Sequence, residues 1–169
     1  PKILTGDQAD VAASICRRVK IPSEIILTGA DLDQMTDDEL GKTVEDIHVF
    51  AELTPGQKVR IVSALRQNGH TVGFLGDGIN DIPAFCESNV GISVDTAVDA
   101  AKDAADVVLL QKDLGVLEQG ILEGRKTFTN MLKYIKITAS SNFGNIFSIV
   151  CASAFLPFLP MTSLQILLL

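Results

Sequence analysis

The sequence predicts an α/β fold built on a parallel sheet, followed by a long apolar helical segment. Short runs of apolar residues alternate with stretches of helical pattern, which is typical of a parallel sheet. Several of these runs end in Gly, Thr or Asp, as strands do where a ligand binds. The last charged residue is Lys136, and the 33 residues after it carry no charge. We expect two parts, residues 1–124 and 125–169, with the boundary inside one long helix near Gly124.

The first elements follow from local signals. The run KIL is a strand that ends at Thr5-Gly6-Asp7, where Asp7 can cap a helix that runs to about Val19. EIILTG is a second strand, and TDDE is a capping box that opens a helix at Thr36.

The later elements repeat this alternation. HVFAE is a third strand, and Thr54, Pro55 and Gln57 give an N-cap, a first-turn proline and a capping partner for a helix over residues 55–68, which stops at Gly69. TVGFLG is a fourth strand. GISV and DVVLL are further short strands, separated by the alanine-rich TAVDAAKDAA.

The charge-free tail predicts a membrane segment. Residues 137–156 supply about 20 positions at roughly 1.5 Å each, enough for a hydrocarbon layer of about 30 Å. PFLP at 157–160 predicts a tight turn, and residues 161–169 the start of a second transmembrane helix. Basic residues just before the tail place residues 1–136 on the cytoplasmic side of the cell membrane. The alternative, a buried helix of a soluble protein, is less favoured because such helices rarely extend so far without a charge.

Composition excludes several classes of function. The 21 acidic residues outnumber the 14 basic ones, for a net charge of −7, which argues against nucleic acid as a partner. Cys16, Cys86 and Cys151 form no CxxC pair, so neither a disulfide framework nor a thiolate metal site is expected, and a reducing compartment is the simpler interpretation. No signal peptide is visible at Pro1, and the ending LQILLL suggests a segment of a larger protein.

Three predicted strand ends carry polar side chains that suit a phosphate and Mg²⁺. They are Thr5-Gly6-Asp7, Thr54-Pro55 with Lys58, and the loop GDGIND at 76–81. Thr-Gly-Asp alone is most often a turn, and Thr-Pro-x-x-Lys alone a capped surface helix with a solvated lysine. GDGIND is more specific, because a turn needs neither both aspartates nor the asparagine. Glycines let the backbone approach an anion, and two carboxylates with phosphate oxygens are ligands that Mg²⁺ accepts.

These motifs carry a resemblance to a known family. ILTGD, TPGQK and GDGINDIPA resemble the second half of the phosphorylation domain of P-type cation-transporting ATPases, which are haloacid-dehalogenase-like phosphotransferases with a Rossmann-like parallel sheet. LEGRKTFTNMLKYIKITASSNFGNIFS and ASAFLPFLPM are similar to the fifth transmembrane helix and following turn of the magnesium-transporting branch. Departures are modest: Ile82 stands where the family more often has Ala, and FCESNV replaces a more usual turn.

The resemblance implies a role in ATP-driven transport of a cation, Mg²⁺ by the branch, with ATP and Mg²⁺ as cofactors and the lipid bilayer and the pump's remaining domains as partners. Thr5 would bond the transferred phosphoryl group, and Gly6 and Asp7 would lie beside the nucleotide. Lys58 would offset charge on the phosphoryl oxygens. The family phosphorylates an aspartate in a DKTG segment, which this sequence lacks, so the nucleophile is expected upstream of Pro1.

The remaining implied roles fall in the loop at 76–81. Asp77 would ligate Mg²⁺, and Asp81 would support the metal site. Asn80 would touch the phosphoryl group, and Gly78 would line the nucleotide site.

Two other functions stay open at this level. A soluble phosphatase of the same superfamily would use a similar loop, although the charge-free tail argues against it, and a binding-only remnant would account for the missing nucleophile. In the tail, one helix face carries a stripe of small and polar residues that includes Asn145, with Asn142 at its edge. These two amides are candidates for the transport path, and the alternative is that the stripe packs against neighbouring helices.

Overall fold

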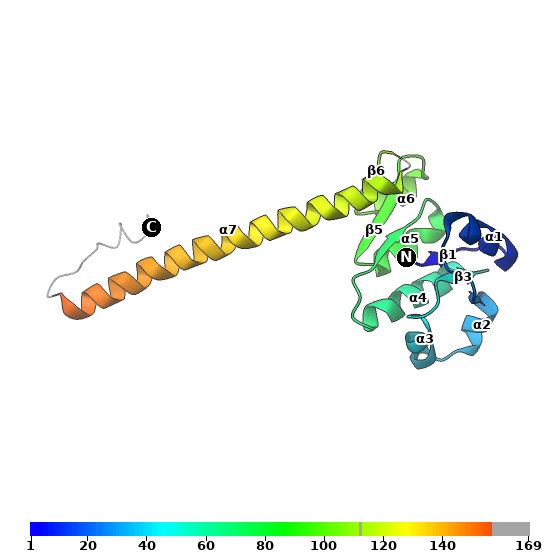
Figure 1. The fold of residues 1–169 in the computed structure, drawn as a ribbon, viewed down its shortest axis with the longest axis horizontal. Coiled ribbons are helices and arrows are strands. Elements are labelled where there is room, and N and C mark those ends of the chain that lie inside the picture. The colour runs from blue at the N-terminus through cyan, green and yellow to red at the C-terminus, as the bar shows by residue number, and fades with distance from the viewer. Residues whose placement is uncertain (112, 157–169) are drawn as a thin grey trace. The chain divides into compact units, whose positions relative to one another are not determined.

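The computed structural model describes residues 1–111 and 113–156 (Figure 1). The chain divides into two units, Pro1–Lys112 and Asp113–Leu169. The elements of the first unit, in chain order, are β1 (Ile3–Leu4), α1 (Ala9–Val19), β2 (Ile26–Thr28), α2 (Gly29–Gln34), α3 (Asp37–Thr43), β3 (Val49–Ala51), α4 (Pro55–Gln67), β4 (Gly73–Leu75), the 3₁₀ turn η1 (Ile79–Asp81), α5 (Ile82–Glu87), β5 (Val90–Val94), α6 (Asp99–Ala104) and β6 (Val107–Leu109). The second unit contains the helix α7 (Leu114–Phe155).

The described strands form two three-stranded sheets in the first unit, with orders β1-β3-β2 and β4-β5-β6. All four strand pairings are parallel, which confirms the predicted α/β class. Because parallel strands end at the same edge of a sheet, the loops after β1, β2 and β3 lie together, as do those after β4, β5 and β6.

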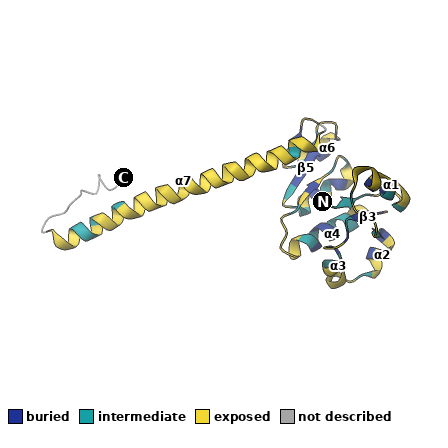
Figure 2. Cartoon of the chain, viewed as in Figure 1, coloured by how far each residue is buried: buried dark blue, intermediate teal, exposed yellow. Residues whose placement is uncertain are grey.

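The helix α4 belongs to two hydrophobic clusters and so joins the two sheets into one body. Ile61 packs with Phe50 of β3 in the first cluster, and Val62 packs with Phe74 of β4 in the second. Leu4 of β1 packs against both clusters. Figure 2 shows buried residues, in dark blue, among the strands and helices of the first unit. The position of α4 decides where the side chains of its first turn reach.

Three capping boxes set helix starts in the first unit. Thr36 caps α3 and Thr54 caps α4, as predicted. Thr28 caps α2, a short helix that was not predicted because its first residues were assigned to the preceding strand. The predicted cap at Asp7 is wrong. The N-cap of α1 is Gln8, without a side-chain cap, and Glu52 Oε1 accepts from the amide of Ala9 at 3.4 Å instead.

The second unit is described as one helix of 42 residues, α7. The prediction of a membrane-spanning hairpin is not supported by the residues described, since none of their helices is long and apolar enough to cross a membrane. Although the run after Lys136 is uncharged, Asn142, Asn145 and several hydroxyl side chains lower its hydropathy. The predicted turn at 157–160 and the helix start at 161–169 lie outside the described residues.

Candidate functional site

A largely buried ion pair joins two of the three predicted motifs. Lys58 Nζ donates to Asp81 Oδ1 at 2.7 Å, and the two side chains are only 13% and 12% exposed. Lys58 lies in the first turn of α4, after β3, and Asp81 ends η1, after β4. The structure therefore brings TPGQK and GDGIND together, 23 residues apart in sequence.

The loop at 76–81 folds back on its second aspartate. A Cβ atom added at Gly76 would lie 2.6 Å from Asp81 Oδ2, so this position has no room for a side chain. The amide of Gly78 donates to the same Oδ2 at 3.4 Å, which is a long bond. Both oxygens of Asp81 thus have donors within the chain. Asp77 and Asn80 are exposed, and within the described residues the Asp77 carboxylate has no hydrogen-bond partner.

The Thr5-Gly6-Asp7 loop is closed on itself and tied to the end of β3. Thr5 Oγ1 donates to Asp7 Oδ2 and accepts from the Asp7 amide, both at 3.1 Å. The Leu53 amide donates to the Thr5 carbonyl at 3.0 Å, and the Glu52 amide to the Asp7 carbonyl at 2.9 Å. In the part of the chain that the structure describes, no hydrogen bond connects this loop to Lys58 or Asp81; its bonds to Glu52 and Leu53 link it to the segment between β3 and α4.

The donor set fits Mg²⁺ in part. Mg²⁺ keeps several waters and binds through one or two carboxylates and phosphate oxygens, so it needs no cage of protein ligands. The described residues accordingly contain no group of three or more His, Cys, Asp or Glu side chains that could hold a metal ion. Asp77 is exposed and unpaired among them, which suits a ligand. Asp81 is committed to Lys58, which suits a supporting role.

Sequence reasoning assigned Gln57 only to a capping box and did not single out Arg60. Gln57 Nε2 also donates to the Gly29 carbonyl at 2.9 Å and to Asp33 Oδ1 at 2.7 Å. The Arg60 guanidinium donates to the Leu32 carbonyl at 2.6 Å, to the Met35 carbonyl, and to Asp37 Oδ1 at 2.7 Å. The available signal was the spacing, because residues 57, 60, 61, 64 and 68 share one face of α4.

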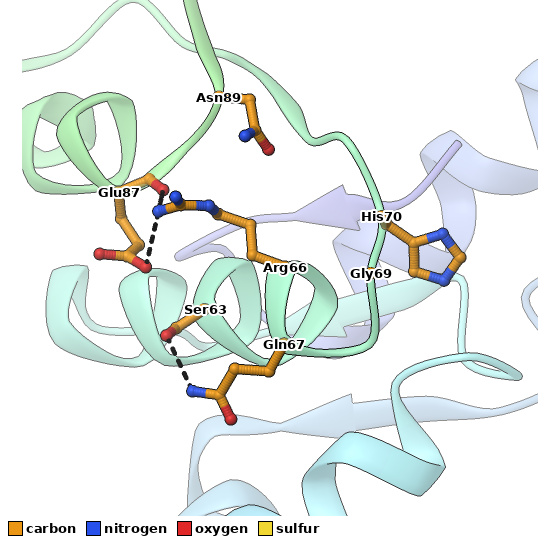
Figure 3. A pocket seen from close by; sticks show the side chains of 7 residues that line it. All are labelled: Ser63, Arg66, Gln67, Gly69, His70, Glu87 and Asn89. Atoms are coloured by element: carbon orange, nitrogen blue, oxygen red, sulfur yellow. Dashed lines mark hydrogen bonds and ion pairs between the residues drawn. The ribbon is translucent and has the colours of Figure 1, made fainter.

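A separate hollow of about 430 Å³ lies near the other end of α4 (Figure 3). Its polar groups bond to one another or to adjacent residues: Arg66 to the carbonyl and carboxylate of Glu87, and Gln67 to Ser63. His70 contacts Glu45, outside the hollow, at 2.9 Å. Hydrogen bonds from Asn68 and then His70 hold the pKa of Glu45 below its usual value. These pairings leave no convergent set of free donors, so the hollow is not a second site.

The first unit is thus an α/β domain of parallel strands with polar loops at their carboxyl ends, two of which a Lys–Asp pair joins. Comparison with known proteins agrees. The chain is 58% identical over 167 residues to the magnesium-transporting ATPase, P-type 1, of Salmonella typhimurium strain LT2, covering 99% of this chain and 18% of that protein. It is 35% identical over 168 residues to a calcium-transporting ATPase of Bacillus subtilis strain 168, covering 98% and 19%.

Solved structures give the same result. A zinc-transporting PIB-type ATPase in the E2.Pi state matches with a TM-score of 0.68 and 28% identity, over 90% of this chain and 21% of that one. No protein-family model matches. The chain belongs to the P-type cation-transporting ATPases as a segment homologous to their magnesium-transporting members, and it spans about a fifth of the length of the curated relatives that it matches.

Proposed function

We propose that this chain is part of an ATP-driven magnesium pump and supplies the metal-binding and phosphoryl-stabilising half of its phosphorylation site. The observation that carries the proposal is the buried contact of 2.7 Å between Lys58 and Asp81, which joins two family motifs at the carboxyl ends of parallel strands. Identity of 58% over 99% of the chain to a magnesium-transporting ATPase supports it and disfavours the soluble phosphatase.

Each side chain receives a role that fits its surroundings. Asp77, exposed and unpaired among the described residues, is the Mg²⁺ ligand, and the ion supplies positive charge beside the phosphoryl oxygens. Lys58 adds a second positive charge, and Asp81 holds Lys58 in place and so supports the metal site. Asn80, exposed in the same loop, donates to the phosphoryl group. The site works by positioning and electrostatics.

The nucleotide side of the site is assigned to the loop after β1 and to Gly78. The Thr5 hydroxyl, turned toward Asp7 in the structure, bonds the phosphoryl group, while Gly6 and Asp7 lie beside ATP. The phosphate-accepting aspartate comes from outside this sequence, which contains no DKTG segment. The remaining domains of the pump are therefore partners of this chain.

The decisive experiment replaces the proposed metal ligand, Asp77, and the positively charged Lys58, one at a time, in the intact pump. Asp77→Asn is expected to raise the Mg²⁺ concentration needed for phosphoenzyme formation at least tenfold, and Lys58→Ala to lower ATP turnover about 100-fold, because each loses charge compensation at the phosphoryl group. Asp103→Asn and Lys42→Ala, both exposed, are matched controls and should behave as wild type. Near-normal phosphorylation in Asp77→Asn at ordinary Mg²⁺ would refute the metal assignment.

The finer part of the proposal concerns the membrane. The pump resides in the cell membrane with residues 1–136 on the cytoplasmic side, a location supported by the transport named for the relatives and by the basic residues that precede the charge-free run. Residues 1–124 form the end of the phosphorylation domain, and residues 125–169 the stalk and the membrane segment. Asn142 and Asn145 offer amide oxygens to the cation or to its waters.

Substitution of the two asparagines tests the transport path. Asn142→Ala and Asn145→Ala should each raise the Mg²⁺ concentration for half-maximal transport severalfold, while phosphorylation from ATP persists. Ser140→Ala, exposed on the same helix, serves as the control. Unchanged cation affinity in both variants would assign the small and polar stripe to helix packing.

A further inference from the structure

The side chain of Gln57 bridges the ends of two neighbouring strands. Its Oε1 accepts from the Thr54 amide at 2.9 Å, just after β3. Its Nε2 donates to the Gly29 carbonyl at 2.9 Å, just after β2, and to Asp33 Oδ1 of α2 at 2.7 Å. The acceptor half of this amide completes the capping box of α4, whereas capping does not require the donor half.

The bridge depends on a close approach of the two strand ends. A Cβ atom added at Gly29 would lie 2.5 Å from the Glu52 carbonyl oxygen and 2.6 Å from Gln57 Oε1. Glu52 itself has a φ of 57°, in the left-handed region that non-glycine residues rarely adopt. Such a conformation persists where the surrounding contacts enforce it, and here the Glu52 amide donates to the Asp7 carbonyl while its carboxylate accepts from the Ala9 amide at the start of α1.

The bridge lies one residue before Lys58. Gln57 and Ile61 share the face of α4 that meets the first hydrophobic cluster, while Lys58 and Val62 share the neighbouring face that meets the second. Rotation of the first turn of α4 about the helix axis would carry both residues together. The bonds to Gly29 and Asp33 thus hold the same helical turn from which Lys58 donates to Asp81.

We infer that Gln57 is a positioning residue for Lys58, acting through the donor half of its amide. The inference rests on the proposed role of Lys58. It requires that the donor half matter for turnover as well as for stability, which separates it from a plain capping role.

The two halves of the amide can be separated by substitution in the intact pump. Gln57→Glu keeps an acceptor for the Thr54 amide, removes the donor and sets a carboxylate against Asp33. Asp33→Asn then restores a donor between the two side chains, although the Gly29 carbonyl stays without the donor that Gln57 gave it. Gln67→Glu, at an exposed position of the same helix, is the matched control. Gln57→Leu removes both halves without adding charge and serves as the second variant.

We expect Gln57→Glu and Gln57→Leu to lower kcat about tenfold with an unchanged KM for ATP, because Lys58 acts on the phosphoryl oxygens. The double variant with Asp33→Asn should recover part of the kcat lost in Gln57→Glu, because it restores the contact with residue 33 but not the bond to the Gly29 carbonyl, and Gln67→Glu should match wild type. A wild-type kcat in Gln57→Glu and Gln57→Leu, or no recovery in the double variant, would overturn the inference.

Lys58→Ala, measured beside these variants, distinguishes a failure of the proposed role of Lys58 from a failure of the positioning role of Gln57. Normal turnover in Lys58→Ala overturns the role of Lys58 and the positioning inference with it. Lost turnover in Lys58→Ala together with normal turnover in the Gln57 variants overturns only the positioning role.

Discussion

The ion pair between Lys58 and Asp81 should contribute strongly to stability as a coupled unit. The two charges lie 2.7 Å apart and are only 13% and 12% exposed, so neither is well solvated if the other is removed. Breaking a buried pair at one partner costs about 3–5 kcal/mol. We expect Asp81→Asn to lower the free energy of unfolding by about 3 kcal/mol, the lower end of this range, because the four-carbon stem of Lys58 lets its ammonium move toward water.

Lys58→Met should cost about as much, since Asp81 loses its cation but keeps the bond from the Gly78 amide. The double variant replaces both charges and should lose about 3–4 kcal/mol rather than the sum of about 6, which gives a coupling energy of about 2–3 kcal/mol. Urea unfolding of the 169-residue chain, followed by far-UV circular dichroism, measures all four free energies.

The pair between Lys102 and Asp99 provides a matched control cycle. Its nitrogen–oxygen distance is similar, 2.9 Å, but the Asp99 side chain is 94% exposed. Solvent screens such a pair, so its coupling should fall within the error of the measurement. A coupling below about 0.5 kcal/mol between Lys58 and Asp81 would refute the claim that burial strengthens their interaction.

Three further outcomes are expected. The chain alone, supplied with Mg²⁺ and ATP, should form no phosphoenzyme because its sequence has no DKTG segment; phosphate release that disappears in Asp77→Ala would contradict this. Ser93→Ala should raise stability by about 1 kcal/mol in urea unfolding, because the Ser93 hydroxyl is buried without a hydrogen-bond partner in the described residues; a loss of stability would indicate a hidden partner. Hydrogen bonds from Thr36 hold the pKa of Glu39 below 4.5, so the contribution of Glu39 to stability is present above pH 4.5 and is lost as pH falls through the lowered pKa. Glu39→Gln should therefore make the free energy of unfolding depend less on pH in acid, and an unchanged dependence would contradict this contribution.

Local chemistry made parts of the fold predictable. The capping boxes at Thr36 and Thr54 join residues three apart, and both appear as predicted. The same signal at Thr28, with Asp31 as its partner, was present but was assigned to the preceding strand. The cap of α1 could not be predicted, because Glu52, 43 residues from Ala9, supplies the acceptor.

The site was predictable as a set of strand ends but not as a set of contacts. Order along the chain placed Lys58 and Asp81 at carboxyl ends of parallel strands, and the pair of 2.7 Å between them depends on α4 packing with both clusters. The bond from Gln57 to Gly29 depends likewise on two strand ends that meet only in the folded sheet. The membrane segment was harder to predict, since lack of charge is a weaker criterion than hydropathy. Asn142 and Asn145 carry no charge but lower the hydropathy of the run, so the two criteria give different answers for the described helix.

The loop GDGIND contains two aspartates four residues apart that lie in different surroundings and receive different proposed roles. A buried carboxylate is costly unless it is paired, and Asp81 meets that condition through Lys58 and the Gly78 amide. Asp77 is exposed, so water solvates its carboxylate without a partner in the chain. The two side chains could not exchange surroundings. A buried Asp77 would have no cation beside it, and an exposed Asp81 could no longer hold Lys58. Asp81→Asn should therefore act through the position of Lys58, and Asp77→Asn through the metal ion alone.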